Sequence, residues 1–129
     1  QAQATSMGLQ EHIIFTGVRT DVNELMQAMD IFVFPSLYEG LPVTMIEAQA
    51  AGLPCVISEN VPDECVVTTG LVTAKKLSDT PQEWAQHILK RIHCPRTDHT
   101  CEIAAAGYDI VTAAKQLEKF YVQKYEENP

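Results

Sequence analysis

The chain has 129 residues, of which 46% are hydrophobic and 20% are charged, values ordinary for one globular domain with its own core. Its formal net charge of -8 disfavours nonspecific binding to nucleic acid or to an anionic membrane surface. No apolar run is long enough to span a membrane and no signal peptide is visible, so we expect a cytoplasmic protein without a membrane span in this segment.

The first elements in chain order are a helix and a strand. Residues 1–10 have the pattern of a helix end that finishes near Gly8. Residues 12–18 are predicted to form a strand that ends at Gly17. The apolar side chains expected to be buried in that strand are Ile13, Ile14 and Phe15.

A short helix is predicted next. Asp21 and Glu24, three residues apart, have the spacing of a capping box that opens a helix through about Met29. Leu25, Met26 and Met29 lie at helical spacing and form its apolar stripe, for which we expect core packing.

The central stretch is predicted to be a buried strand, a glycine turn and a helix. Residues 31–34 form a continuous apolar run, as expected of a parallel strand covered on both faces. Pro35 ends the strand because it has no N–H to donate. After the turn at Gly40, Pro42 suits the first helical position, and Gly52 suits a left-handed cap at the other end of the helix.

Two further strands complete the predicted sheet, over residues 54–58 and 71–73, with a loop or one-turn helix between them. Strands thus alternate with helices, which predicts an α/β fold: a Rossmann-like three-layer α/β/α unit with a mostly parallel sheet. Ligands of such sheets bind beyond the carboxyl ends of the strands. We therefore expect the site in the loops near residues 17–19, 36–43 and 58–64.

Three helices are predicted after the last strand. The first covers residues 80–92 and begins with an N-cap, a proline at N1 and a glutamate at N3. The second covers about residues 97–106, and Asp109 caps a third that reaches about Tyr125. We assign the aromatic stripe of the third helix, Phe120, Tyr121 and Tyr125, to core or interface packing rather than to ligand binding. The apolar residues of this amphipathic helix are Ile110, Ala113, Ala114, Leu117, Phe120 and Tyr121.

The cysteines are expected to be free thiols, because their spacing is not that of a disulfide framework. His93 and His99 lie near the last two of them, but the C-x4-H-x-C spacing matches no common zinc module. We therefore expect no metal site. The four cysteines are Cys55, Cys65, Cys94 and Cys101.

Two carboxylates stand out beside the glycine turn. Glu39 lies in the turn, and Glu47 lies in an alanine-rich apolar helix where burial would require a hydrogen-bonding partner. The N-terminus of that helix favours an anion such as phosphate, through free N–H groups and the helix dipole. A ligand with both phosphate and hydroxyl groups would use all these features. The alternative is a solvated loop residue at Glu39 and a partly exposed helix residue at Glu47.

The segment that holds both carboxylates resembles a known enzyme family. Glu39 and Glu47 are separated by seven residues within PSLYEGLPVTMIEAQAAGLPCV, which is similar to the E-x7-E region of the retaining family-4, group 1 glycosyltransferases of the GT-B fold. The similarity is strong over about residues 8–73. The flanks that agree with that family are Phe15-Thr16-Gly17, Asp21-Val22-Asn23-Glu24-Leu25, Asp30 and Gly52-Leu53-Pro54-Cys55-Val56.

The resemblance implies that residues 1–129 are a single domain, the truncated C-terminal donor-binding domain of such an enzyme, without its N-terminal acceptor domain. It implies that Glu39 is a catalytic-site residue that hydrogen-bonds the transferred sugar, and that Glu47 accepts hydrogen bonds from the ribose hydroxyls. The residues whose backbone N–H groups would face the diphosphate are Gly40, Leu41, Val43 and Thr44. Those expected beside the base are Gly17, Val18 and Arg19.

The resemblance also implies the reaction: transfer of a sugar from a nucleotide-diphosphate sugar, by default UDP-linked, without a metal ion or other cofactor. Polysaccharide or glycoconjugate synthesis is the expected setting, with the full-length enzyme at the inner face of the membrane. The Arg and Lys that clamp the diphosphate in that family match no residue here, so we expect this chain to be inactive alone. Its expected partners are the donor, the N-terminal domain and, through an exposed sheet edge, a second copy.

Two other classes stay open at this point. A non-catalytic nucleotide- or phosphate-binding α/β module of flavodoxin-like or response-regulator-like type would also combine alternating strands with acidic loop tips. No acidic pair or Ser/Thr-rich loop follows the first predicted strand, as such a module would need. A GT-B nucleotide-sugar epimerase shares the scaffold, and a fold does not determine a function.

Overall fold

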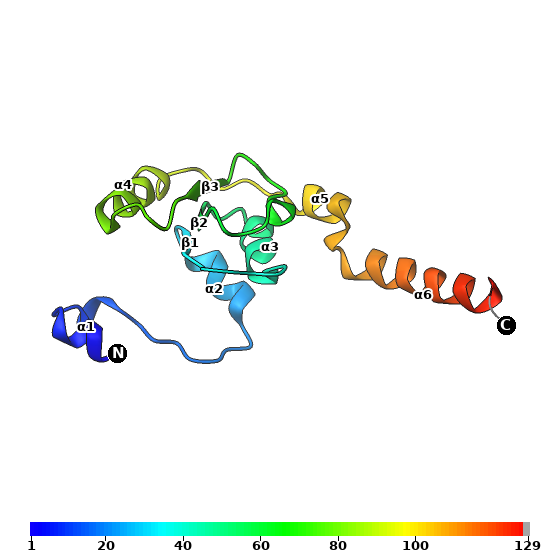
Figure 1. Cartoon of the computed structure of the whole chain (residues 1–129), viewed down its shortest axis with the longest axis horizontal. Helices are drawn as coiled ribbons and strands as arrows, with labels where there is room; N and C mark the ends of the chain where they lie inside the picture. The colour runs from blue at the N-terminus through cyan, green and yellow to red at the C-terminus, as the bar shows by residue number, and fades with distance from the viewer. Residues whose placement is uncertain (128–129) are drawn as a thin grey trace.

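The computed structural model describes residues 1–127, in which helices surround a small sheet and extend from it at both ends (Figure 1). Helix α1 lies at one end, and the long helix α6 projects from the other. In chain order the elements are α1 (Ala2–Ser6), η1 (Gln10–His12), α2 (Val22–Ala28), β1 (Phe32–Phe34), α3 (Val43–Ala50), β2 (Cys55–Ser58), η2 (Asp63–Cys65), β3 (Val72–Lys75), α4 (Pro81–Arg91), α5 (Thr100–Ile103), the π-helical turn η3 (Ala104–Tyr108) and α6 (Ile110–Glu127).

The sheet has the strand order β1-β2-β3, and both pairings are parallel. Cys55 of β2 is in register with Phe32 of β1 on one side and with Val72 of β3 on the other. Because β1 connects to β2 through helix α3, the predicted alternation of strands and helices is confirmed. The α/β fold with a parallel sheet is therefore what the sequence predicted.

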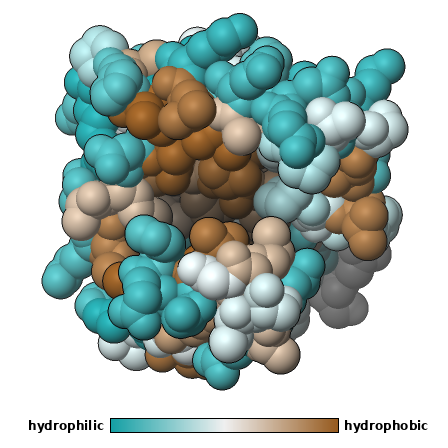
Figure 2. Space-filling model, turned by 90° about the vertical axis from the view of Figure 1, so that its left-hand side faces the viewer, coloured by the Kyte–Doolittle hydropathy of each residue, from teal (hydrophilic) through white to brown (hydrophobic). Residues whose placement is uncertain are grey.

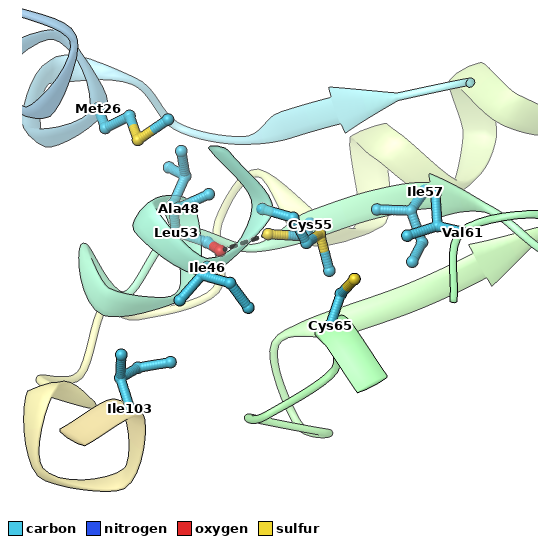
Figure 3. Packing of buried hydrophobic residues seen from close by; sticks show 10 residues of the cluster. Met26, Ile46, Ala48, Leu53, Cys55, Ile57, Val61, Cys65 and Ile103 are labelled. Atoms are coloured by element: carbon cyan, nitrogen blue, oxygen red, sulfur yellow. Dashed lines mark hydrogen bonds between the residues drawn. The ribbon is translucent and has the colours of Figure 1, made fainter. Parts of the chain in front are cut away.

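The core lies around β2, whose four residues are all buried. Successive side chains of a strand point to opposite faces, so the burial of both Cys55 and Val56 means that both faces of β2 are covered. Figure 1 draws α3 on one side of the sheet and α4 on the other. Figure 3 shows the core that β2 shares with α2, α3 and α5, through Met26, Ile46 and Ile103.

Strand β1 is covered on one face only, which corrects the prediction of a strand buried on both faces. The rings of Phe32 and Phe34 stack with centroids 5.5 Å apart and lie half-buried beside the core. Val33, on the opposite face, keeps 39% of its surface exposed. Since β1 is an edge strand, nothing among residues 1–127 pairs with its outer side.

Helix α3 is bounded by the two residues that the sequence indicated. Pro42 is the N-cap instead of the predicted first helical residue, so the helix begins one residue later, at Val43. The proline offers no side-chain cap to the first helical N–H groups. At the other end Gly52 has φ +66°, so the predicted left-handed cap is confirmed. Its N–H bonds to the Gln49 carbonyl at 2.9 Å, and the Leu53 N–H bonds to the Ala48 carbonyl at 2.9 Å.

The strand predicted over residues 12–18 is wrong. Its apolar side chains are exposed: Ile13 by 39%, Ile14 by 87% and Phe15 by 55%. Figure 1 draws this segment as part of an extended connection from α1 to α2, away from the sheet. A strand gains stability only from a ladder partner and from burial of one face, and neither is available to these residues.

Helix α2 forms where predicted, but its N-terminal capping box does not. The Asp21 side chain makes no capping hydrogen bond. Instead the Arg19 guanidinium holds both carboxylate oxygens, with Nε 2.7 Å from Oδ1. This hydrogen bond also lowers the pKa of Asp21 from its ordinary value.

Helix α4 follows its sequence signals closely. Thr80 and Glu83 form the predicted capping box, in which the Thr80 N–H bonds to Glu83 Oε2 at 2.7 Å. The Trp84 Nε1–H donates to the Lys76 carbonyl at 3.0 Å and fixes the helix beside the loop after β3. Figure 2 shows apolar side chains around a hollow at this end of the molecule. The mostly apolar groove where β1 ends and α4 begins is lined by Pro35, Leu77, Asp79, Pro81, Trp84, Ala85 and Ile88.

Helix α6 begins as predicted but does not pack as part of the core. Asp109 caps it by accepting from the Thr112 N–H at 2.7 Å. The aromatic stripe faces solvent, with Phe120 53%, Tyr121 63% and Tyr125 77% exposed. The core assignment for this stripe is therefore wrong within this chain, and the interface assignment stays a prediction. None of the helices among residues 1–127 is long and apolar enough to cross a membrane.

Candidate functional site

The candidate site lies at the carboxyl ends of β1 and β2, where two loops are joined by hydrogen bonds. The Ser58 hydroxyl donates to the Ser36 carbonyl at 2.5 Å, and the Asn60 amide donates to the Leu37 carbonyl at 2.9 Å. These bonds link residues that are 22 and 23 positions apart. The structure thus brings together the predicted loops 36–43 and 58–64.

Glu39 lies half-buried in the first of these loops. The Ser36 hydroxyl donates to Glu39 Oε1 at 2.6 Å and lies 3.2 Å from the Tyr38 carbonyl. Since a hydroxyl has one proton, the shorter contact to the carboxylate is the main one. The second carboxylate oxygen, Oε2, has no partner among residues 1–127 and is available to a ligand hydroxyl.

The start of α3 offers a group of unpaired backbone donors. Met45 N–H bonds back to the Pro42 carbonyl at 3.0 Å. Within residues 1–127, the N–H groups before it have no acceptor. They add to the positive end of the helix dipole and favour an anion. The residues that carry these donors are Gly40, Leu41, Val43 and Thr44.

Glu47 is exposed on α3 and has no side-chain partner within the described part of the chain. Of the two alternatives for Glu47, the exposed helix residue is the one observed, because the buried face of α3 consists of its neighbours Met45, Ile46, Ala48 and Gln49. Glu47 follows Val43 by four residues, so the two share one side of the helix. The carboxylate thus lies one turn from the unpaired N–H groups.

The loop of Gly17, Val18 and Arg19 does not join this site. No hydrogen bond connects these three residues to residues 36–64, and Val18 is fully exposed. The reason is the failure of the preceding strand, which was expected to deliver the loop to the sheet edge. The Arg19 side chain is occupied by Asp21 instead.

Sequence reasoning missed the residues that hold the site together. Gln49 is completely buried behind α3, where its amide Nε2 donates to the Cys65 carbonyl at 2.6 Å and its Oε1 accepts from the Val67 and Thr68 N–H groups, both at 2.9 Å. It thereby fixes the segment after η2 against α3. The signal in the sequence was a polar residue at i+4 from the buried Met45, on the apolar face of the helix.

The prediction that the cysteines are free thiols is confirmed. All four are free thiols. Burial raises the pKa of Cys55 to about 12, although the nearby Arg91 cation acts against this shift. The Cys55 side chain is therefore an unreactive thiol that bonds to the Leu53 carbonyl at 3.2 Å. Within residues 1–127, no group of three or more His, Cys, Asp or Glu side chains could hold a metal ion.

Comparison with known proteins identifies the family. The family described as "Glycosyl transferases group 1" matches residues 1–93, which include both loops of the site and all of α3. The chain belongs to the group 1 glycosyl transferases. This confirms the family resemblance seen in the sequence.

Several relatives are similar to this chain over parts of their length. EpsF of Bacillus subtilis (strain 168) is named as a glycosyltransferase. It is 39% identical to this chain over 112 residues, which cover 84% of this chain and 29% of EpsF. The UDP-Gal:alpha-D-GlcNAc-diphosphoundecaprenol alpha-1,3-galactosyltransferase of Escherichia coli is 41% identical over 63 residues, 49% of this chain and 16% of that enzyme. The N,N'-diacetylbacillosaminyl-diphospho-undecaprenol alpha-1,3-N-acetylgalactosaminyltransferase of Campylobacter jejuni is 49% identical over 45 residues, 35% of this chain and 12% of that enzyme.

The chain thus spans less than a third of the length of each of these three relatives. No solved structure matches it.

Proposed function

We propose that this chain is the donor-binding part of a retaining glycosyltransferase that transfers a sugar from a nucleotide-diphosphate sugar. The observation that carries the proposal is the start of α3, where unpaired N–H groups and the Glu39 and Glu47 carboxylates lie within one loop and two helical turns. Family membership supports the reaction type. The geometry supports the ligand class, because it combines an anion site with two acceptors for hydroxyl groups.

The diphosphate would bind at the α3 N-terminus. The N–H groups of Gly40, Leu41, Val43 and Thr44 would donate to its oxygens, with the helix dipole adding to the attraction. The same donors would stabilise the negative charge that develops on the leaving diphosphate. The proposal therefore includes transfer without a metal ion.

The two carboxylates would divide the hydroxyl groups of the donor between them. Glu47 would accept from both ribose hydroxyls, because its two oxygens are unpaired and face solvent. Glu39 would accept from the transferred sugar through Oε2, since Oε1 is held by Ser36. Contacts of residues 17–19 with the base are not part of the proposal, because the structure leaves that loop apart.

For the substrate, we propose a UDP-linked donor and a cytoplasmic role in polysaccharide or glycoconjugate synthesis. Support comes from the name of the Escherichia coli relative, a galactosyltransferase with a UDP-Gal donor and a diphosphoundecaprenol-linked acceptor. The Campylobacter jejuni relative is also named for a diphospho-undecaprenol-linked acceptor.

Glu47→Ala is expected to weaken UDP binding by the chain about tenfold, because the ribose loses two hydrogen bonds to a charged group. Isothermal titration with UDP, GDP and ADP measures this change. Glu118→Ala is the matched control, since Glu118 is an exposed helix residue of α6, and it should leave the affinity unchanged. Absence of nucleotide binding, or equal loss in both variants, would contradict the proposal.

The 129-residue chain by itself is expected to show no sugar transfer, because the proposal gives it the donor side of the reaction only. A coupled assay of UDP release with a set of UDP-sugars and acceptors measures the rate of transfer. Detectable turnover by this chain would show that the acceptor side lies within residues 1–129.

A further inference from the structure

We propose that Ser36, Ser58 and Asn60 are positioning residues that orient the Glu39 carboxylate toward the sugar of the donor. The inference rests on the proposed donor site and adds the residues that determine how much the sugar contributes to the binding affinity of the donor. It starts from the Ser36 hydroxyl, which lies 2.6 Å from Glu39 Oε1. A hydrogen bond of this length to a carboxylate is charge-assisted and directional. It fixes one oxygen of Glu39 and leaves Oε2 as the acceptor for a ligand.

Ser36 is in turn anchored to the most buried strand of the sheet. Its carbonyl accepts from the Ser58 hydroxyl at 2.5 Å, and Ser58 is the last residue of β2 with no exposed surface. The chain of bonds therefore runs from the core to the candidate site: Ser58 to the Ser36 backbone, and the Ser36 side chain to Glu39. A side chain held in this way depends on the second strand for its position.

The rest of the loop has little else to hold it. Leu37 is 79% exposed and Tyr38 is 84% exposed, so apolar packing contributes little to the conformation of this segment. A further hydrogen bond to this loop comes from the Asn60 amide, which donates to the Leu37 carbonyl at 2.9 Å. Because hydrogen bonds rather than packing order the loop, removal of Ser58 or Asn60 should loosen Glu39 without disturbing the core.

Most of the nucleotide half of the site does not depend on this arrangement. Glu47 and the N–H groups of Val43 and Thr44 belong to α3, which is held by the buried Gln49 and by its Gly52 cap. The N–H groups of Gly40 and Leu41 lie in the loop just before this helix. The structure thus separates a sugar-facing group held by hydrogen bonds from a nucleotide-facing group held by a packed helix. Loss of a positioning residue should change the contribution of the sugar and spare the affinity for UDP.

The test measures two dissociation constants: the Kd of UDP and the Kd of one sugar nucleotide. The sugar nucleotide is UDP-glucose or UDP-galactose, whichever the wild type binds more tightly, and the ratio of its Kd to that of UDP reports the contribution of the sugar. In Ser36→Ala, Ser58→Ala and Asn60→Ala, the Kd for UDP should stay within about twofold of wild type. The ratio of the two Kd values should move at least about threefold toward that of Glu39→Ala. Ser36→Thr keeps the hydroxyl and should restore the ratio, and Ser78→Ala, at an exposed loop position, is the control.

A double-mutant cycle separates positioning from a merely structural role. If Ser36 acts through Glu39, adding Ser36→Ala to Glu39→Ala should cause no further change in the ratio. Additive effects would overturn the inference, as would a Glu39→Ala variant with an unchanged ratio. A Kd for UDP that changes as much as the Kd for the sugar nucleotide would assign the three residues to general stability and would equally overturn it.

A second measurement needs no ligand and separates failure of this inference from failure of the proposed function. Backbone 15N relaxation of the free chain should show greater mobility of Leu37 and Tyr38 in Ser58→Ala and Asn60→Ala, with Val56 in β2 unchanged. If UDP does not bind, the proposed donor site is wrong. If UDP binds but the loop stays as rigid as in wild type, the donor site stands and the positioning role is wrong.

Discussion

Gly52→Ala is expected to destabilise the chain by about 2–4 kcal/mol, a large share of the stability of a small domain. Gly52 has φ +66°, which costs about 1 kcal/mol for alanine. In addition, a Cβ at this position would overlap the backbone carbonyl oxygen of Thr97. Because the obstacle is backbone, a side-chain rotation cannot relieve it. Urea unfolding followed by circular dichroism measures the change.

Gly8→Ala is the matched control for that experiment. Gly8 has nearly the same conformation, φ +68°, but no heavy atom lies within 4 Å of an added Cβ. It should therefore cost at most about 1 kcal/mol. Equal destabilisation by the two substitutions would show that the loop around Thr97 does not pack against the end of α3.

Gln49→Leu is expected to cost about 3 kcal/mol or more in the free energy of unfolding, although it preserves most of the side-chain volume. The substitution leaves the Val67 and Thr68 N–H groups and the Cys65 carbonyl without their partner. Each buried polar group that loses its hydrogen bond costs about 1–3 kcal/mol. The segment after η2 should also exchange its amide protons faster.

Gln86→Leu provides the comparison, since Gln86 is exposed in the middle of α4 and makes no side-chain hydrogen bond within residues 1–127. Its effect should stay within about 0.5 kcal/mol. If Gln49→Leu were as mild as Gln86→Leu, the buried amide would not be what holds the 66–68 segment to α3.

Elements with strong local signals were predictable from the sequence. The strands β1 and β2 follow apolar runs, and α4 follows a capping box that the structure reproduces. The end of α3 at Gly52 follows from the conformational freedom of glycine. In each case a few neighbouring residues determine the local structure, so the sequence of that segment is enough to predict it.

Predictions failed where structure depends on partners distant in the sequence. Residues 12–18 have the composition of a strand, but a strand needs a ladder and a covered face, which composition does not reveal. Asp21 has the spacing of a cap, but its carboxylate is bound by the neighbouring Arg19 instead of by the helix N–H groups. The burial of Glu47 was left open because the composition of α3 does not show which side faces the core.

The sequence indicated the ligand-facing residues of the candidate site but not the residues whose hydrogen bonds hold its loops together. Glu39, Gly40 and Glu47 were found through their spacing around a helix start. Ser58 and Asn60 were not, because each acts on a backbone carbonyl more than twenty positions away. Hydrogen bonds of that kind leave no local pattern, since serine and asparagine are common in any loop.

The central claim is that the start of α3 binds the nucleoside diphosphate of a sugar donor. The most direct measurement is a 1H–15N chemical-shift map of the labelled chain during titration with millimolar UDP, repeated on Glu47→Ala. We predict that the amides of Gly40, Leu41, Val43 and Thr44 shift together in the wild type, and that the variant shifts far less. Unchanged amides at the start of α3, or shifts confined to another part of the chain, would contradict the claim.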